Sequence, residues 1–313
     1  MKYFLYVVRR LVTLIPVGLG ITLLVFLLLK IVPGDPAVTL LGTHVTDAGV
    51  AALHQQLGLD RPLWQQYLTF LGKLLHGDLG ESYQYQSSVS SLVLQNLVPT
   101  IWLIVTGALF AVIIAVPLAV WAASHRNGFS DNAIRTIPLI GLGMPAFWLG
   151  IMLVLLFSLK AGAFPASGFG DGFANHVKSI VLPGLTVALA LVPILVRSLR
   201  ASMTDVLQSD YITTARAKGL GGARVVFGHA LRNAAISSIT VLGVNVAYLV
   251  GSTLVVEKVF ALNGIGYLMI NAIFNRDFPI VQGITLVFAV MVVLVNLLTD
   301  MTHAALDPRV RLA

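Results

Sequence analysis

Six long stretches without a charged residue constrain the fold of this chain more than any other feature. They cover residues 11–29, 101–123, 136–159, 180–196, 234–256 and 278–299, each close to the roughly 20 residues that a helix needs to cross a bilayer. The strands of a membrane barrel would alternate in polarity, whereas these stretches are apolar on every face. Only 11% of the residues are charged, against about 25% in soluble domains. We therefore expect an all-α membrane protein with six transmembrane helices.

The lysines and arginines indicate how these helices are oriented. If the N-terminus is cytoplasmic, the inside segments hold 13 of the 20 basic residues: Lys2, Arg9, Arg10, Arg126, Arg135, Arg197, Arg200, Arg216, Lys218, Arg224, Arg232, Arg309 and Arg311. Basic residues concentrate on the cytoplasmic side of membrane proteins, so we expect both termini in the cytoplasm. The net charge of +7 then reflects topology and contact with the lipid bilayer, and it does not require nucleic acid as a partner.

The expected spans divide the chain into four parts. Residues 1–32 hold the N-terminal tail and an uncleaved first span, because no small-residue cleavage site follows the apolar run. Residues 33–97 form an extracytoplasmic region, in which Trp64–Leu75 is amphipathic and suits a helix packed at the membrane interface or, alternatively, one that contacts another protein. Residues 98–305 form the transmembrane core, including a cytoplasmic loop over 203–233. Residues 306–313 form a cytoplasmic tail.

A polar island at residues 209–233 interrupts the apolar core. Ser209 or Asp210 can cap a helix that runs to Lys218, because a short side-chain oxygen accepts from the free N–H groups at a helix start. Gly219 ends this helix, and a second helix is expected over 223–231. The result is an αα-hairpin. Its small residues would let the surface of another protein approach closely.

Two linked blocks in this island resemble the signature cytoplasmic loop of binding-protein-dependent ABC importer permeases. Thr213, Thr214 and Ala215 are followed after three positions by Gly219. The peptide and nickel branch of the family carries TARAKGL followed by HxLRN, and both are present, at residues 214–220 and 229–233. Residues 33–36, 57–62, 76–82 and 306–311 also resemble this branch. One departure is Leu262-Asn263, which stands where the outer re-entrant turn of the family has an aromatic residue and a proline.

The resemblance implies a type I ABC importer permease of the bacterial inner membrane. Such a subunit would pair with a second homologous permease, two ATP-binding subunits and an extracytoplasmic solute-binding protein. ATP and Mg would be bound by the ATPase subunits, so this chain would hold no cofactor and would not itself be an enzyme. The residues implied to form the ATPase-coupling loop are Asp210, Tyr211, Thr213, Thr214, Ala215, Arg216, Ala217, Lys218, Gly219, Leu220, His229, Arg232 and Asn233.

Other classes of protein are less well supported. No G-x-x-x-x-G-K-[ST] sequence occurs, so no phosphate-binding loop is expected. The seven histidines are scattered and cysteine is absent, so we expect no metal site. A self-contained secondary transporter would normally carry ionisable residues within its spans, and the six apolar stretches carry none. A membrane-embedded enzyme would need clustered catalytic groups.

The substrate is less constrained than the class of protein. A neutral, cysteine-free path suits short peptides, whereas a bare nickel ion would be expected to meet histidine, cysteine or methionine ligands. A chelated metal could also cross a neutral path, and residues 272–277 and 304–309 resemble nickel permeases as closely as dipeptide permeases. We favour short peptides, with nickel or a metal chelate as the alternative.

Overall fold

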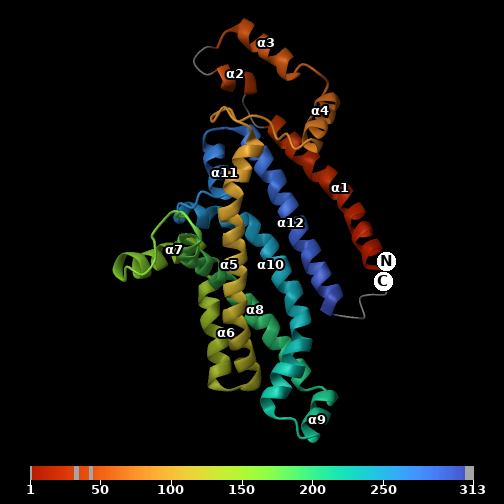
Figure 1. Ribbon diagram of the computed structural model, residues 1–313, viewed down its shortest axis with the longest axis vertical. Helices are drawn as coiled ribbons and strands as arrows, with labels where there is room; N and C mark the ends of the chain where they lie inside the picture. The colour runs from red at the N-terminus through yellow and green to blue at the C-terminus, as the bar shows by residue number, and fades with distance from the viewer. Residues whose placement is uncertain (1, 32–34, 42–44, 307–313) are drawn as a thin grey trace. The chain divides into compact units, whose positions relative to one another are not determined.

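A computed structural model describes residues 2–31, 35–41 and 45–306. In these ranges the chain is helical and contains no β-strand, apart from one isolated bridge between Glu81 and Ser88. Most of the tail expected over 306–313 and part of the 33–36 block lie outside the described residues. The helices are α1 (Lys2–Ile31), α2 (Pro36–Leu41), α3 (Asp47–Leu57), α4 (Leu63–Leu75), α5 (Val89–Ser124), α6 (Phe129–Leu142), α7 (Ala146–Leu153), η1 (Val154–Lys160), α8 (Phe173–Leu207), α9 (Asp210–Ala217), η2 (Arg224–Ala230), α10 (Leu231–Val259), α11 (Ile265–Phe274) and α12 (Phe278–Leu306) (Figure 1).

Two compact units make up the chain. Unit 1 comprises Met1–Val98 and Leu268–Val290, and unit 2 comprises Pro99–Tyr267 and Met291–Ala313. Four of the described helices are long and apolar enough to cross a membrane: Val89–Ser124, Phe173–Leu207, Arg224–Val259 and Phe278–Ala305. The length and composition of these helices fit an all-helical membrane protein with several candidate spans.

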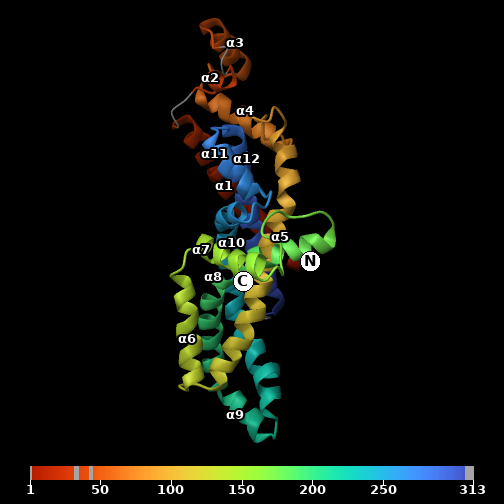
Figure 2. The same cartoon turned by 90° about the vertical axis from the view of Figure 1, so that its left-hand side faces the viewer.

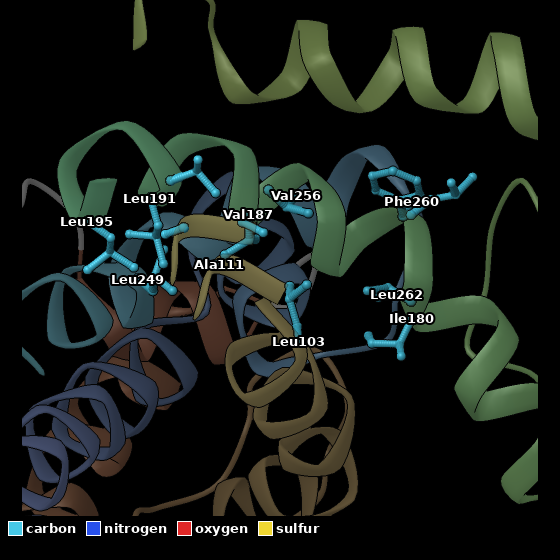
Figure 3. Packing of buried hydrophobic residues seen from close by; sticks show 14 of the residues in the cluster. Leu103, Ala111, Ile180, Val187, Leu191, Leu195, Leu249, Val256, Phe260 and Leu262 are labelled. Atoms are coloured by element: carbon cyan, nitrogen blue, oxygen red, sulfur yellow. The ribbon is translucent and has the colours of Figure 1, made fainter. Parts of the chain in front are cut away.

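The core of unit 2 is built where α5, α8 and α10 meet. More of α8 is buried than of any other candidate span, because α5, α6, α7 and α10 all pack against it. Figure 3 shows the buried side chains: Leu103 and Ala111 from α5, Val187, Leu191 and Leu195 from α8, and Leu249 and Val256 from α10. These three helices therefore form one packed body.

Small residues allow these helices to approach closely. A Cβ atom at Gly107 of α5 would lie 2.5 Å from Val187 of α8, and one at Gly184 of α8 would lie 2.9 Å from the Thr106 hydroxyl of α5. Small residues at helix crossings are typical of membrane bundles, where packing contributes much of the attraction between helices. The glycines of α5 and α8 therefore set the distance between the two helices.

The third expected span differs from the prediction. A single helix over 136–159 is wrong, because α6 ends at Leu142 and α7 begins at Ala146. Pro145 has no N–H to continue the α6 hydrogen-bond ladder, and it has extended backbone (ψ 138°). The chain therefore changes direction between the two segments, as Figure 1 shows, and the second segment continues as η1 to Lys160.

In unit 1 the amphipathic helix expected over 64–75 is present as α4. Its Tyr67 and Phe70 rings lie 5.5 Å and 6.1 Å from the Phe26 ring of α1. The Tyr67 hydroxyl is also hydrogen-bonded to Thr22, with 3.0 Å between the oxygens. Trp64, by contrast, is 62% exposed. One face of α4 is thus fixed on α1, and its tryptophan remains free for a lipid headgroup region or another protein.

A buried hydrogen-bond cluster shapes the turn that follows α10. Glu257 is fully buried and accepts from the Thr100 hydroxyl (2.7 Å) and from the Tyr267 N–H (2.8 Å). Gly264 and Gly266 lie against the Glu257 carboxylate, where any Cβ would clash. Leu262, in place of the aromatic residue of the family, is fully buried in the core. The carboxylate thereby holds the start of α11 beside the end of α10.

Gly243 provides a test of the close packing in unit 2. A Cβ at this position of α10 would clash with Thr299 of α12, whereas a Cβ at Gly251 of the same helix would have nothing within 4 Å. We expect Gly243→Ala to destabilise the protein by ~1–3 kcal/mol, as overpacking does, and Gly251→Ala to have no such effect. Thermal unfolding in detergent measures both variants, and equal midpoints for the two would contradict this packing.

Candidate functional site

The polar island forms a hairpin at one end of the α8 and α10 pair. α8 ends at Leu207, α9 follows over Asp210–Ala217, and the chain enters η2 at Arg224. Figures 1 and 2 show α9 beyond the ends of α8 and α10 in both views. The sequence island is therefore a structural unit, joined at both ends to a long apolar helix.

The start of α9 only partly matches the prediction. Ser209 occupies the N-cap position, but its side chain makes no capping bond to α9. Its hydroxyl instead donates to the Val206 carbonyl at the end of α8 (2.5 Å). Asp210, in the first turn, places a negative charge near the positive end of the helix dipole. Ser209 thus belongs to the end of α8, and Asp210 favours the start of α9.

Gly219 ends α9 as the sequence predicts. Its φ of +80° lies in the left-handed region that favours glycine. The Gly219 N–H donates to the Arg216 carbonyl (2.9 Å) and the Leu220 N–H to the Ala215 carbonyl (3.3 Å). This pair of bonds is a Schellman motif, which satisfies carbonyl groups that the helix end would otherwise leave free. The turn is therefore defined by its own backbone.

The two faces of α9 differ in character. Ile212 and Ala215 are buried against Val225 of η2. Thr213, Thr214 and Ala217 are exposed, which leaves a face of short side chains turned away from the protein. Ala215 therefore lies on the inner side of the hairpin, although the sequence groups it with the small residues of the outer face.

The second helix of the hairpin is not a separate element. The sequence predicts a helix over 223–231 that is distinct from the span at 234–256, whereas η2 passes directly into α10 at Leu231. A hydrogen bond from the Asn233 amide to the Tyr211 hydroxyl (2.8 Å) joins α10 to α9. The block at residues 229–233 is thus tied to the first turn of α9, the helix in which the other block begins.

The remaining predicted residues lie mostly on the surface of the hairpin. Arg216, Lys218 and Arg232 are exposed, whereas Leu220 and His229 are half-buried. Arg216 and Arg126 both line a hollow of about 400 Å³ between the ends of α5 and α8 and the hairpin. The hollow holds basic side chains that suit acidic groups on another protein. In the part of the chain that the structure describes, no group of three or more potential metal ligands occurs.

The base of the hairpin is a packed cluster. Ala119 and Ala123 of α5, Met203 of α8, Ala230 at the end of η2 and Ala234 in the first turn of α10 are all buried together. The sequence signal for this cluster is the repeated alanine in segments otherwise rich in larger apolar residues. Small side chains there bring the three helix ends close together.

A buried ion pair lies near this base, and sequence reasoning missed it. The Arg200 guanidinium of α8 donates to both carboxylate oxygens of Asp131 in α6, at 2.5 Å and 2.6 Å. The Asn127 N–H also donates to Asp131 (3.0 Å), and the Asp131 side chain is completely buried. The bonds from Arg200 hold the pKa of the Asp131 carboxyl below its usual range, against the opposing effect of burial. The sequence signal that could have indicated this pair is Asp131 itself, an acidic residue in a short segment whose other charged residues are basic.

These features define a polytopic helical membrane protein with a polar hairpin between two of its long helices. Residues 115–312 match the family described as binding-protein-dependent transport system inner membrane component, and residues 3–104 match the N-terminal family of the same membrane components. The chain belongs to this family, and it is the permease subunit of an ABC importer of the peptide and nickel branch. It is a membrane component and not the catalytic subunit of its transporter.

Similar proteins cover almost the whole chain. The glutathione transport system permease protein GsiC of Pectobacterium atrosepticum is 40% identical over 306 residues, which is 98% of each chain. The protein of that name from Escherichia coli K12 is 37% identical over the same length. A solved structure of the MetNI methionine ABC transporter in an inward-facing conformation has a TM-score of 0.57 at 18% identity, over 69% of this chain and 96% of that one. This last likeness concerns the fold alone.

Removing the Asp131 carboxylate should destabilise unit 2. Asp131→Ala leaves Arg200 without its partner, and breaking a buried pair typically costs ~3–5 kcal/mol of folding free energy.

The stabilisation by this pair also depends on pH. Because the pKa of the Asp131 carboxyl is lowered in the folded state, the stabilisation is present above its unfolded pKa of about 3.9 and is lost as the pH falls through its folded pKa. Thermal unfolding in detergent measures the effect. Asp205→Asn, at an exposed position of α8, is the control, and equal midpoints for the two variants would contradict a stabilising pair.

Proposed function

We propose that this chain imports short peptides as one of two homologous permeases that together form the translocation path. An extracytoplasmic binding protein delivers the peptide, and two ATPase subunits bind ATP and Mg and supply the energy. The names of the 37–40% identical relatives, which refer to the tripeptide glutathione, support a peptide substrate over nickel or a metal chelate. Membership of an ABC importer family argues against a self-contained secondary transporter.

The observation that carries this proposal is the exposed small-residue face of α9. Thr213, Thr214 and Ala217 leave room for a cleft of an ATPase subunit to close around the helix, and Arg216 and Lys218 lie at its edge. Ile212 and Ala215 fix α9 to η2, which continues into α10. A force applied to α9 is therefore passed to α10 and, through the cluster at the hairpin base, to α5 and α8. This is a rigid-body form of coupling.

The proposal includes a topology of six spans with both termini in the cytoplasm. Four spans are the candidate helices, α1 supplies the first, and the broken segment α6–α7–η1 supplies the third. The hairpin then lies in the cytoplasm, where ATPase subunits are found. The charge distribution along the sequence supports this orientation.

The coupling role can be tested at Ala217. Ala217→Trp places a large side chain on the exposed face of α9 without entering the buried cluster, so we expect the variant to fold. ATP-driven uptake should fall about tenfold or more, because a steric clash of ~1–3 kcal/mol weakens docking of the ATPase subunit. Uptake into vesicles and ATPase activity of the purified complex are the measurements. Ala174→Trp, at an exposed position in the first turn of α8, is the matched control. Normal uptake by Ala217→Trp would show that this face is not the docking surface.

The topology can be tested with single cysteines, because the natural chain has none. A cysteine at Gly222, which is exposed in the hairpin, should be protected from an impermeant maleimide added to intact cells. A cysteine at Ala163, between η1 and α8, should react. The opposite labelling would invert the proposed orientation.

A further inference from the structure

Unit 1 contains a cavity whose size fits a short peptide. It has a volume of about 550 Å³ and lies between α1, the loop before α4, α4 itself, residues 78–83 and the start of α12. Its described lining residues all belong to unit 1. Ligand sites in proteins commonly measure about 300–1,000 Å³. The cavity is therefore large enough for a di- or tripeptide.

In the part of the chain that the structure describes, three basic side chains and one acidic side chain line this cavity. Lys30, Arg61 and Lys73 are the basic residues and Asp78 is the acidic one. The Asp78 carboxylate accepts from the Gly80 N–H (2.8 Å) and so caps its own loop. Among the described residues, neither Arg61 nor Lys73 has a carboxylate partner within 4.0 Å. The cavity thus has an excess of positive charge that the protein itself does not neutralise.

Hydrogen bonds hold part of this basic lining in place. The Lys30 ammonium group donates to the Gln66 side-chain oxygen (2.6 Å) and lies 5.6 Å from the centre of the Phe26 ring. The Gln66 amide donates in turn to the carbonyl groups of Leu59 (2.9 Å) and Arg61 (2.7 Å). One glutamine therefore fixes the end of α1 relative to the loop that carries Arg61. The geometry exists before any ligand arrives, which lowers the entropic cost of binding.

Lys30, Arg61 and Lys73 come from segments that the proposed topology places on the outer side of the membrane, where the chain has few basic residues. In the proposed topology only Lys30, Arg61, Lys73, Lys160, Lys178, Lys258 and Arg276 lie outside. Membrane proteins place fewer basic residues on this side, yet three of the seven face a single cavity. Topology alone does not explain such a concentration, whereas an anionic ligand does. Phe70 and Leu79 add an apolar wall for the rest of that ligand.

We propose that this cavity binds the carboxylate groups of short anionic peptides as they pass from the binding protein to the translocation path. The inference rests on the proposed function, because it places the cavity on the side from which the peptide arrives. Arg61 and Lys73 attract the carboxylates, and the aromatic and aliphatic wall contacts the remainder of the peptide. The site selects for negative charge and adds to the selection made by the binding protein.

Equilibrium dialysis of radiolabelled glutathione against the purified transporter tests the site. Glutathione has two carboxylates and one ammonium group, and its dimethyl ester lacks the carboxylate charges. The variant Arg61→Gln with Lys73→Gln should bind glutathione about fivefold more weakly, as expected for two partly exposed ion pairs. Its affinity for the ester should change less than twofold. Raising the salt concentration should weaken glutathione binding to the wild-type protein.

Two control variants separate charge from other effects. Arg61→Lys with Lys73→Arg keeps the charge and should bind within about twofold of wild type. Lys160→Gln with Lys178→Gln removes two basic residues that lie outside the cavity and should also bind normally. Unchanged glutathione binding by the Arg61→Gln, Lys73→Gln variant, or equal losses for glutathione and its ester, would overturn the proposed site.

ATP-driven uptake by the same preparations distinguishes this inference from the proposed function. Charge-dependent glutathione binding without uptake of any short peptide would support the site and overturn peptide import. The opposite result is peptide uptake by the wild-type protein with unchanged glutathione binding in the Arg61→Gln, Lys73→Gln variant. It would support peptide import and overturn the site.

Discussion

The packing of α8 against α10 fixes the geometry on which the hairpin depends. α9 has only eight residues and buries only Ile212 and Ala215. An isolated helix of this length is not stable in water, because the conformational entropy lost on nucleation outweighs the stabilisation from so few hydrogen bonds. Its position is therefore set by the ends of the two long helices and by η2, against which it packs. A change in the angle between α8 and α10 changes where α9 presents its exposed face.

The two fully buried carboxylates of unit 2, Asp131 and Glu257, lie near the ends of helices and not at their centres. Asp131 and Arg200 join α6 to α8 near the hairpin, and Glu257 joins α10 to the start of α11. In a membrane protein, charges near the ends of spans avoid the hydrocarbon core, where desolvation costs most. The middle of the bundle is held instead by close contacts such as those of Gly107 and Gly243. Polar contacts define how the helices end, and glycines define how closely they pack.

Local signals allowed much of the fold to be predicted from the sequence. Gly219 marks the end of α9 because a left-handed residue is needed there, and the amphipathic pattern over residues 64–75 marks α4, although Trp64 lies on the exposed side of that helix. The break at Pro145 was missed because a proline inside an apolar stretch is compatible with either a kinked or an interrupted membrane helix. The pairs Asp131–Arg200 and Thr100–Glu257 join residues 69 and 157 positions apart. No local pattern connects such residues, so only the three-dimensional structure could bring them together.

The direct passage of η2 into α10 makes a single lever of the segment Arg224–Val259. With 36 residues and a rise of about 1.5 Å per residue, this lever is ~54 Å long. One arm carries the hairpin, and the opposite arm carries Glu257 and the turn that leads to α11. A tilt of about 5° around its middle displaces each end by roughly 2.4 Å in opposite directions, from the same helix length. A displacement of α9 is therefore transmitted to the Glu257 turn at about the same amplitude, without any change in secondary structure.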